Sequence, residues 1–180
     1  EFAVGTPGTV GGALRMNAGT SHEYIGSRVL SITSLRPGQG LRRYNASDVS
    51  WGYRETSFPY DEIVLECELS TNEGDKEAIR VKMETALSRR RKTQPLSMPS
   101  CGSVFRNPER ESVGRLIENV GLKGAMCGAA QISELHANFI VNRGGARAVE
   151  VLALIHAVQD AVGQRYGIEL VPEVRFLGFA

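Results

Sequence analysis

Ser103 is the side chain whose sequence surroundings best suit chemistry. It lies in the segment Ser100-Cys101-Gly102-Ser103-Val104-Phe105-Arg106-Asn107-Pro108, between a glycine and a short apolar step. Gly102 permits close backbone approach and Asn107-Pro108 favours a turn, so the segment presents a hydroxyl from tight backbone. The same features suit a serine that only caps a turn, and from this segment alone that structural role is the more frequent one.

A second candidate site is the glycine block at residues 5–19, Gly-Thr-Pro-Gly-Thr-Val-Gly-Gly-Ala-Leu-Arg-Met-Asn-Ala-Gly, which holds five of the chain's 20 glycines. At this density, successive backbone N–H groups can turn toward one point, as in loops that cradle a phosphate or lie against a flat cofactor ring. A plain connection between strands fits the composition equally well. No strand-forming run precedes the block, which argues against a Rossmann turn.

Two charged residues could act on an anionic substrate. Arg54 lies among aromatic residues at 51–59, and its planar guanidinium could clamp a carboxylate. Glu173 follows Pro172, whose missing donor suits a sheet edge or the start of a strand. Taken alone, each is more often a member of a surface ion pair. His136 and His156 are expected to be structural.

The composition is that of an ordinary globular protein, with 42% hydrophobic residues, 23% charged residues and a formal net charge of +1 over 180 residues. There is no broad basic field for nucleic acid. The three cysteines are far apart and odd in number, which indicates reduced thiols and no metal site. No apolar run approaches the ~20 residues that span a bilayer, and no signal segment is visible. We therefore expect a cytoplasmic protein with no membrane or nucleic-acid partner.

The elements that must position these residues form two lobes of an α+β chain. Residues 1–92 are predicted to be strand-rich, with strands at 28–35 and 63–69 and a helix at 75–91. In the second strand, the alternation places Ile63, Leu65, Cys67 and Leu69 on one face.

Residues 93–180 are predicted to form a separate α+β lobe after the proline-containing segment 93–99. Its expected elements are a helix at 113–120 capped by Ser112, a strand at 137–142, a helix at 148–166, and an alternating strand at 167–178 that carries Glu173.

Five blocks, in this order, resemble the UDP-N-acetylenolpyruvoylglucosamine reductases over nearly the whole chain. They are Gly5–Ala13 with Met16-Asn17-Ala18-Gly19, Tyr53–Phe58, Gly102–Pro108, His136–Asn142 and Pro172–Arg175. The resemblance implies a flavoenzyme of bacterial peptidoglycan precursor synthesis, with the second part of a vanillyl-alcohol-oxidase-like FAD-binding domain at 1–92 and a substrate-binding lobe at 93–180. NADPH would reduce FAD, and the reduced flavin would reduce UDP-N-acetylglucosamine enolpyruvate to UDP-N-acetylmuramate.

The resemblance also implies residue roles. Ser103 would donate a proton, and Arg54 and Glu173 would lie beside the substrate carboxylate. The residues implied for substrate contact are Tyr53, Arg54 and Asn107, and those implied for FAD are Gly8, Thr9, Gly11, Gly12, Asn17 and Gly19.

These roles agree with the chemistry. Hydride attack on an enol ether conjugated to a carboxylate places negative charge on that carboxylate, which Arg54 would stabilise. Glu173 can help only when protonated or sharing a proton, so we expect an environment that raises its pKa above about 4.3. Ser103 becomes an adequate acid only beside a carbanion-like centre with water excluded.

The sequence departs from the family pattern at its start. The resemblance implies that the sequence, from Glu1 onward, is the second part of a longer protein, because the family's amino-terminal Gly-Gly-Gly-Ser-Asn loop is not in it. Residues 20–24 differ from the Ala-Tyr-Gly of many members, and no tyrosine-bearing insertion lies between Phe58 and Ser103, as in the subtype that lacks that loop. The alternative hypothesis is a catalytically silent UDP-sugar binding fragment. A different FAD oxidoreductase would need neither the serine block nor the Pro-Glu-Val-Arg block.

Overall fold

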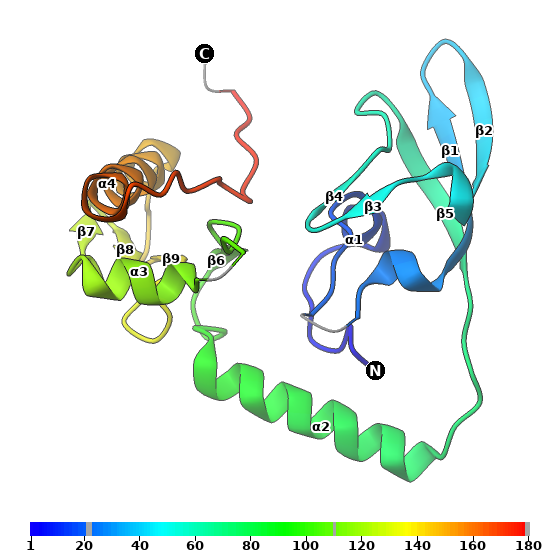
Figure 1. The fold of residues 1–180 in the computed structure, drawn as a ribbon, viewed down its shortest axis with the longest axis horizontal. Coiled ribbons are helices and arrows are strands. Elements are labelled where there is room, and N and C mark those ends of the chain that lie inside the picture. Colours follow the sequence, from blue (N-terminus) through cyan, green and yellow to red (C-terminus); the bar gives the residue numbers. More distant parts are fainter. Residues whose placement is uncertain (21–22, 110, 179–180) are drawn as a thin grey trace. The chain divides into compact units, whose positions relative to one another are not determined.

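The computed structural model describes residues 1–20, 23–109 and 111–178, and the chain divides into two compact units, residues 1–88 and 89–180 (Figure 1). Helix α2 (Lys76–Thr93) runs across the division, and each unit has its own hydrophobic core. The mixture of helices and sheets confirms the predicted α+β class. The assignment of the two halves to a cofactor domain and a substrate lobe stays a prediction.

The first unit is built on an antiparallel sheet with the strand order β2–β1–β5 (Figure 1). Its strands are β1 (Val29–Arg36), β2 (Gly40–Asn45) and β5 (Ile63–Leu69). Gly38 and Gly40 have φ values of +76° and +89° in the turn between β1 and β2, where an L side chain would be strained. Ile32, on the core side of β1, packs with Leu14, Ile25 and Phe58.

The prediction that Ile63, Leu65, Cys67 and Leu69 share one face of β5 is wrong, because the strand contains a bulge. Thr33 pairs with Glu66, but the next residue of β1, Ser34, pairs with Val64, so Leu65 is an extra residue. One extra residue reverses the alternation of a strand. Val64 therefore joins Cys67 against the core, while Ile63 and Leu65 are more than half exposed.

The glycine block contains a short helix instead of a continuous loop. Helix α1 (Val10–Arg15) begins after Thr9, whose Oγ1 accepts the N–H of Gly12 at 3.1 Å. A capping threonine satisfies a backbone donor that would otherwise lack a partner, which favours the helix in spite of its two glycines. Leu14 is the buried residue of α1 and anchors it to the core.

Short elements complete the first unit. They are the 3-10 helices η1 (Ile25–Arg28) and η2 (Ala46–Asp48) and the strands β3 (Trp51–Gly52) and β4 (Glu55–Thr56).

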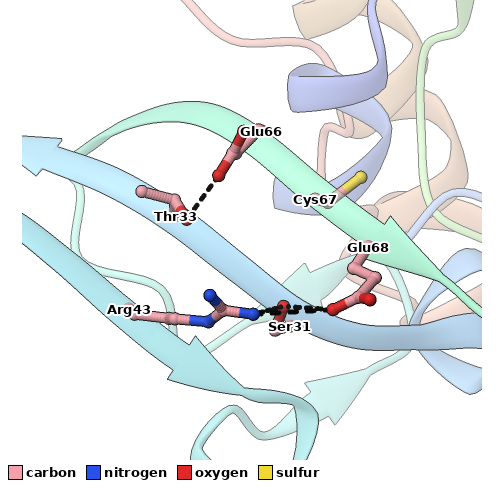
Figure 2. Close-up of a pocket in the computed structure, with 6 residues that line it drawn as sticks. All are labelled: Ser31, Thr33, Arg43, Glu66, Cys67 and Glu68. Carbon is pink, nitrogen blue, oxygen red and sulfur yellow. Dashed lines mark hydrogen bonds and ion pairs between the residues drawn. The ribbon is translucent and has the colours of Figure 1, made fainter.

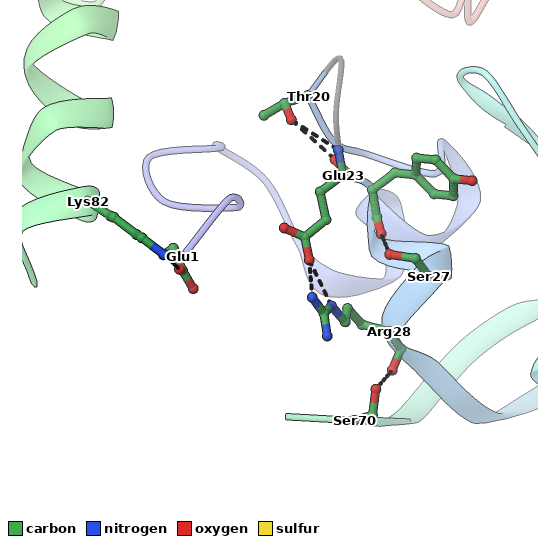
Figure 3. Close-up of polar contacts among 8 residues, drawn as sticks. Glu1, Thr20, Glu23, Ser27, Arg28, Ser70 and Lys82 are labelled. Atoms are coloured by element: carbon green, nitrogen blue, oxygen red, sulfur yellow. Dashed lines mark hydrogen bonds and ion pairs between the residues drawn. The ribbon is translucent and has the colours of Figure 1, made fainter. Parts of the chain in front are cut away.

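Polar contacts hold the end of η1, and an ion pair joins α2 to the first residue of the chain. Figure 3 shows Arg28 in an ion pair with Glu23 and Ser70 Oγ donating to the Arg28 carbonyl at 3.2 Å. The Lys82 ammonium of α2 lies 3.2 Å from the Glu1 carboxylate. Helix α2 confirms the predicted helix, although none of its side chains is fully buried.

The second unit has an antiparallel sheet with the strand order β6–β9–β8–β7. Its elements are β6 (Ser100–Ser103), α3 (Val113–Asn119), β7 (Met126–Cys127), β8 (Ala130–Ile132), β9 (Phe139–Asn142) and α4 (Ala148–Tyr166). The predicted stripe of α4 is confirmed, since Ile155, Val158 and Val162 are in the core with residues of α3 and the sheet. Gly167 ends α4 in the left-handed conformation, at φ +67°.

The predicted strand at 167–178 is wrong, since the described tail forms only an isolated bridge between Pro172 and Phe105. Arg106 N–H donates to the Val171 carbonyl at 3.0 Å, and Glu173 N–H donates to the Val104 carbonyl at 2.7 Å. Pro172 stands between these bonds and has no N–H, so a regular ladder cannot continue through it.

Candidate functional site

Ser103 lies at a bulge in β6. Ser100 pairs with Val141 and Ser103 with Phe139, so three steps along β6 oppose two along β9. Gly102 supplies the left-handed conformation of the bulge, at φ +81°. Within the described residues the Ser103 hydroxyl makes no hydrogen bond, and its residue is half-buried. The hydroxyl is therefore not used as a turn cap there.

Asn138 holds the backbone immediately after the serine. Its Oδ1 accepts the N–H of Phe105 at 3.0 Å, and its Nδ2 donates to the Phe105 carbonyl at 2.9 Å. The Asn138 carbonyl also accepts the N–H of Val104 at 2.9 Å. Both Asn138 and Phe105 are buried, at 4% and 2% exposure. The amide thus acts as a peptide group paired with Phe105, which fixes the serine bulge.

His136 supports Asn138. Its Nδ1 accepts the Asn138 N–H at 3.2 Å, and its ring lies edge-on to Phe139 with centroids 5.0 Å apart. Burial lowers the pKa of His136, which favours the neutral ring that can accept this bond. The structural role predicted for His136 is confirmed by these contacts.

Glu173 is brought to the serine segment by its own backbone. Its N–H donates to the carbonyl of Val104, the residue that follows Ser103. The Glu173 residue is half-buried. The fold therefore gathers two of the three predicted catalytic residues, Ser103 and Glu173, on one short stretch of the second unit.

Asn107 helps to begin helix α3. Its Oδ1 accepts the Val113 N–H at 3.1 Å. Ser112 occupies the N-cap position, as predicted, but its side chain makes no capping bond. The carbonyl oxygen of the exposed Asn107 side chain thus has a structural use, which leaves its amide NH2 as the group for a ligand contact.

Arg54 lies in the first unit, at the tip of the hairpin formed by β3 and β4. Trp51 pairs with Thr56 and Gly52 with Glu55, so Tyr53 and Arg54 are the two loop residues. Arg54 has φ +59°, an uncommon conformation for a side chain of this kind and one that is concentrated at functional sites. Its Nη2 donates to the Gly19 carbonyl at 3.0 Å, and its Cζ lies 5.1 Å from the centroid of the half-exposed Tyr53 ring.

The glycine block has an open part and a part committed to the fold. Gly8 has φ +109° with open space where a Cβ would lie, and Thr9 and Gly12 are exposed. A Cβ added at Gly11 would lie 3.7 Å from the Val64 side chain, so this glycine faces the packed interior. The backbone from Gly8 to Gly12 can therefore be approached closely, which fits a bound cofactor.

Asn17 and Gly19 have other uses. Asn17 is 2% exposed; its Oδ1 accepts the Gly26 N–H at 3.0 Å and its Nδ2 donates to the Gly52 carbonyl at 2.8 Å. A Cβ on Gly19 would lie 2.3 Å from the Glu23 carbonyl oxygen. Their contact with FAD stays a prediction. The Asn17 amide is held by hydrogen bonds within the first unit, and close packing leaves no room for a side chain at residue 19.

Asn138 and Glu62 are buried polar residues for which the sequence predicted no role. Glu62 is 2% exposed and its carboxylate accepts hydrogen bonds from Ser34 Oγ at 2.6 Å and Tyr44 OH at 2.8 Å. Burial alone would raise the pKa of Glu62, but these bonds and the nearby charges of Arg42 and Arg36 outweigh it and lower the pKa. The sequence features that could have identified them are the position of Asn138 directly before an apolar strand and that of Glu62 directly before β5.

A hollow on the solvent face of the sheet holds none of the predicted site residues. Figure 2 shows its polar lining, in which Thr33 donates to Glu66 at 3.0 Å and Ser31 donates to Glu68 at 3.1 Å. Arg43 lies 3.5 Å from Glu68. The lining has one guanidinium, that of Arg43, and two carboxylates, those of Glu66 and Glu68, so its net charge is negative and does not suit an anionic substrate.

Two kinds of feature are absent from the described residues. None of the helices there is long and apolar enough to cross a membrane. In the same residues, no three side chains of His, Cys, Asp or Glu form a group that could hold a metal ion.

Known proteins match the chain over its whole length. The family model of the UDP-N-acetylenolpyruvoylglucosamine reductase C-terminal domain matches residues 94–177. The UDP-N-acetylenolpyruvoylglucosamine reductases of Alkalilimnicola ehrlichii and Halalkalibacterium halodurans are 47% and 45% identical over 100% and 99% of this chain. The match covers 60% of each relative, so the chain spans about three fifths of their length.

A solved structure gives the same result. The crystal structure of UDP-N-acetylenolpyruvylglucosamine reductase (MurB) from Thermus caldophilus matches with a TM-score of 0.85 and 36% identity, over 97% of this chain and 62% of that one. Sequence and fold therefore agree: the chain is similar over its whole length to the UDP-N-acetylenolpyruvoylglucosamine reductases, and residues 94–177 match the model of their C-terminal domain.

Proposed function

We propose that this chain is the larger part of an FAD- and NADPH-dependent oxidoreductase that converts UDP-N-acetylglucosamine enolpyruvate to UDP-N-acetylmuramate, in the cytoplasmic synthesis of peptidoglycan precursors. The observation that carries the proposal is the Ser103 bulge. Its backbone is fixed on one side by Asn138 and on the other by Glu173, while the described residues leave the Ser103 hydroxyl without a hydrogen bond. A rigid backbone with an uncommitted hydroxyl suits a proton donor better than a structural serine.

The open backbone from Gly8 to Gly12 is the part of the chain that fits FAD. Bound there, the flavin would supply the hydride. Arg54 would hold the substrate carboxylate and stabilise the negative charge that develops on it. Ser103 would deliver a proton to the neighbouring carbon, and a protonated Glu173 would donate a hydrogen bond to the enolate-like carboxylate.

Tyr53 and Asn107 would contribute to substrate binding. The Tyr53 ring is half exposed beside the Arg54 guanidinium, so it can cover an apolar part of a ligand. The amide NH2 of Asn107 would donate to the nucleotide portion of the UDP-sugar.

The test uses the full-length enzyme and separates its two half-reactions by stopped-flow absorbance of the flavin. Ser103→Ala should leave flavin reduction by NADPH within about twofold of wild type, while reoxidation by the enolpyruvyl UDP-sugar slows about 10²- to 10⁴-fold, the usual contribution of a general acid. Ser97→Ala is the matched control, since Ser97 is exposed in the same unit. Equal slowing of both half-reactions would refute the proton-donor role.

The chain's share of its relatives, 60%, supports a second candidate function for the chain by itself. A catalytically silent fragment would bind the UDP-sugar saturably in a calorimeter and contain no flavin after reconstitution. Flavin that is bound, bleached by NADPH and restored by the UDP-sugar would instead show that these 180 residues carry the reductase activity.

A further inference from the structure

Asn17 lies where three segments of the first unit meet. It follows α1, and its buried amide joins the N–H of Gly26 in η1 to the carbonyl of Gly52 in β3. Asn17 has φ +43°, a left-handed conformation that asparagine tolerates better than most residues. Both the backbone and the side chain of this residue are therefore specialised for the junction.

The hairpin that carries Arg54 is tied to residues 15–19 by three hydrogen bonds. Asn17 Nδ2 donates to Gly52 O at 2.8 Å, Arg54 Nη2 donates to Gly19 O at 3.0 Å, and Thr56 Oγ1 donates to Arg15 O at 3.2 Å. Of the three, the Asn17 bond has the most buried donor side chain, so water replaces it least readily.

The side chain of Asn17 is thereby largely occupied by the protein. Each polar atom of its amide has a backbone partner, and the residue is 2% exposed. Direct contact between this amide and a cofactor would compete with these bonds. The arrangement suits a residue that acts through the hairpin.

We propose that Asn17 is a positioning residue for Arg54: its amide sets the placement of the β3–β4 hairpin and so the aim of the guanidinium at the substrate carboxylate. This inference rests on the proposed function of Arg54. A misplacement of about 1 Å can cost on the order of 10²-fold in rate. The effect should fall on the half-reaction that uses the substrate and leave flavin binding unchanged.

Asn17→Asp in the full-length enzyme is the sharpest variant. It keeps the shape, tolerates the left-handed backbone and retains an acceptor for Gly26 N–H, but an ionised carboxylate cannot donate to Gly52 O. We expect flavin content and its reduction by NADPH to stay within about twofold of wild type, while reoxidation by the UDP-sugar slows about 10- to 100-fold. A protonated carboxyl can donate, so the defect should shrink as the pH is lowered. Asn72→Asp, an exposed change of the same charge in the same unit, is the control.

A double-mutant cycle separates positioning from a general structural effect. In an Arg54→Ala background, Asn17→Asp should slow reoxidation by less than about twofold, because the residue that it aims is gone. Amide hydrogen exchange of residues 51–56 should accelerate in Asn17→Asp, a readout that does not depend on activity. Thr56→Val, which removes another of the three ties, should give a smaller loss in the same half-reaction.

Loss of bound flavin from folded Asn17→Asp, equal slowing of both half-reactions, or a full further loss in the Arg54→Ala background would overturn the inference. If Asn17→Asp does not fold, normal reoxidation in Thr56→Val with unchanged exchange in residues 51–56 would also overturn it. Failure of the proposed function itself would look different, because the wild-type flavin would then not be reoxidised by the UDP-sugar.

Discussion

Removal of the Asn138 amide should destabilise the serine bulge strongly. Asn138→Ala leaves both the N–H and the carbonyl of Phe105 without their partner, in a site where Phe105 is 2% exposed. Each unsatisfied buried group costs about 1–3 kcal/mol, so the pair amounts to about 2–6 kcal/mol. That is a large part of the 5–15 kcal/mol by which proteins are typically stable.

The matched control is Asn142→Ala, four residues further along the chain at the end of β9. Asn142 Oδ1 also accepts two backbone N–H groups, those of Gly144 and Ala146, at 2.8 and 3.0 Å. These groups lie in a turn that water reaches, so their loss should cost only about 0.5–1.5 kcal/mol. The comparison isolates burial, because residue type and number of lost bonds are alike.

Amide hydrogen exchange of the peptide covering residues 100–107 in the full-length enzyme measures the effect at the serine bulge. In Asn138→Ala, the Phe105 amide should exchange at least about 30-fold faster, which corresponds to roughly 2 kcal/mol, whereas Asn142→Ala should change it little. Flavin reduction by NADPH should be retained. The reasoning is refuted if the two variants destabilise this peptide equally.

The remaining predictions concern the first unit. Because folding lowers the pKa of Glu62, its carboxylate adds stability at pH values above the unfolded pKa of about 4.3, and this stability is lost as the pH falls through the lower folded pKa. In urea unfolding at a series of pH values, Glu62→Gln should therefore lose less stability toward acid pH than wild type does. The same loss in both proteins would exclude this contribution of Glu62. Gly19→Ala should cost at least about 2 kcal/mol in the same assay, because its Cβ would meet the Glu23 carbonyl at 2.3 Å. In Gly12→Ala, the new Cβ would lie 3.3 Å from Thr9 Oγ1, so the variant should fold normally but lose bound flavin. Full flavin content in this variant would show that Gly12 does not contact the cofactor.

Local patterns were sufficient for helices α2, α3 and α4 and for strands β1, β5 and β9. The spacing of Val151, Ile155, Val158 and Val162 predicted α4 with its bounds, because a long amphipathic helix depends on neighbours three and four residues away. The face of β5 could not be predicted in this way. The bulge at Leu65 is set by the pairing of β5 with β1, so alternation within 63–69 alone grouped the wrong residues on one face.

In the candidate site, too, the sequence predicted some features and the tertiary structure decided others. Residue types and their order identified Ser103, Arg54 and Glu173, because the chemistry of a hydroxyl, a guanidinium and a carboxylate is a property of each residue alone. The predicted strand that was to carry Glu173 was wrong, since Pro172 interrupts the ladder and a bond to Val104 places the residue instead.

The sequence by itself determined the family resemblance, the α+β class and the residues able to do chemistry. Only the tertiary structure decided what holds those residues in place. Asn138 binds Phe105 across 33 positions of the chain, and Asn17 binds Gly52 across 35. Local periodicity cannot predict a hydrogen bond between residues so far apart in the sequence, because the two partners come together only when the strands and helices pack.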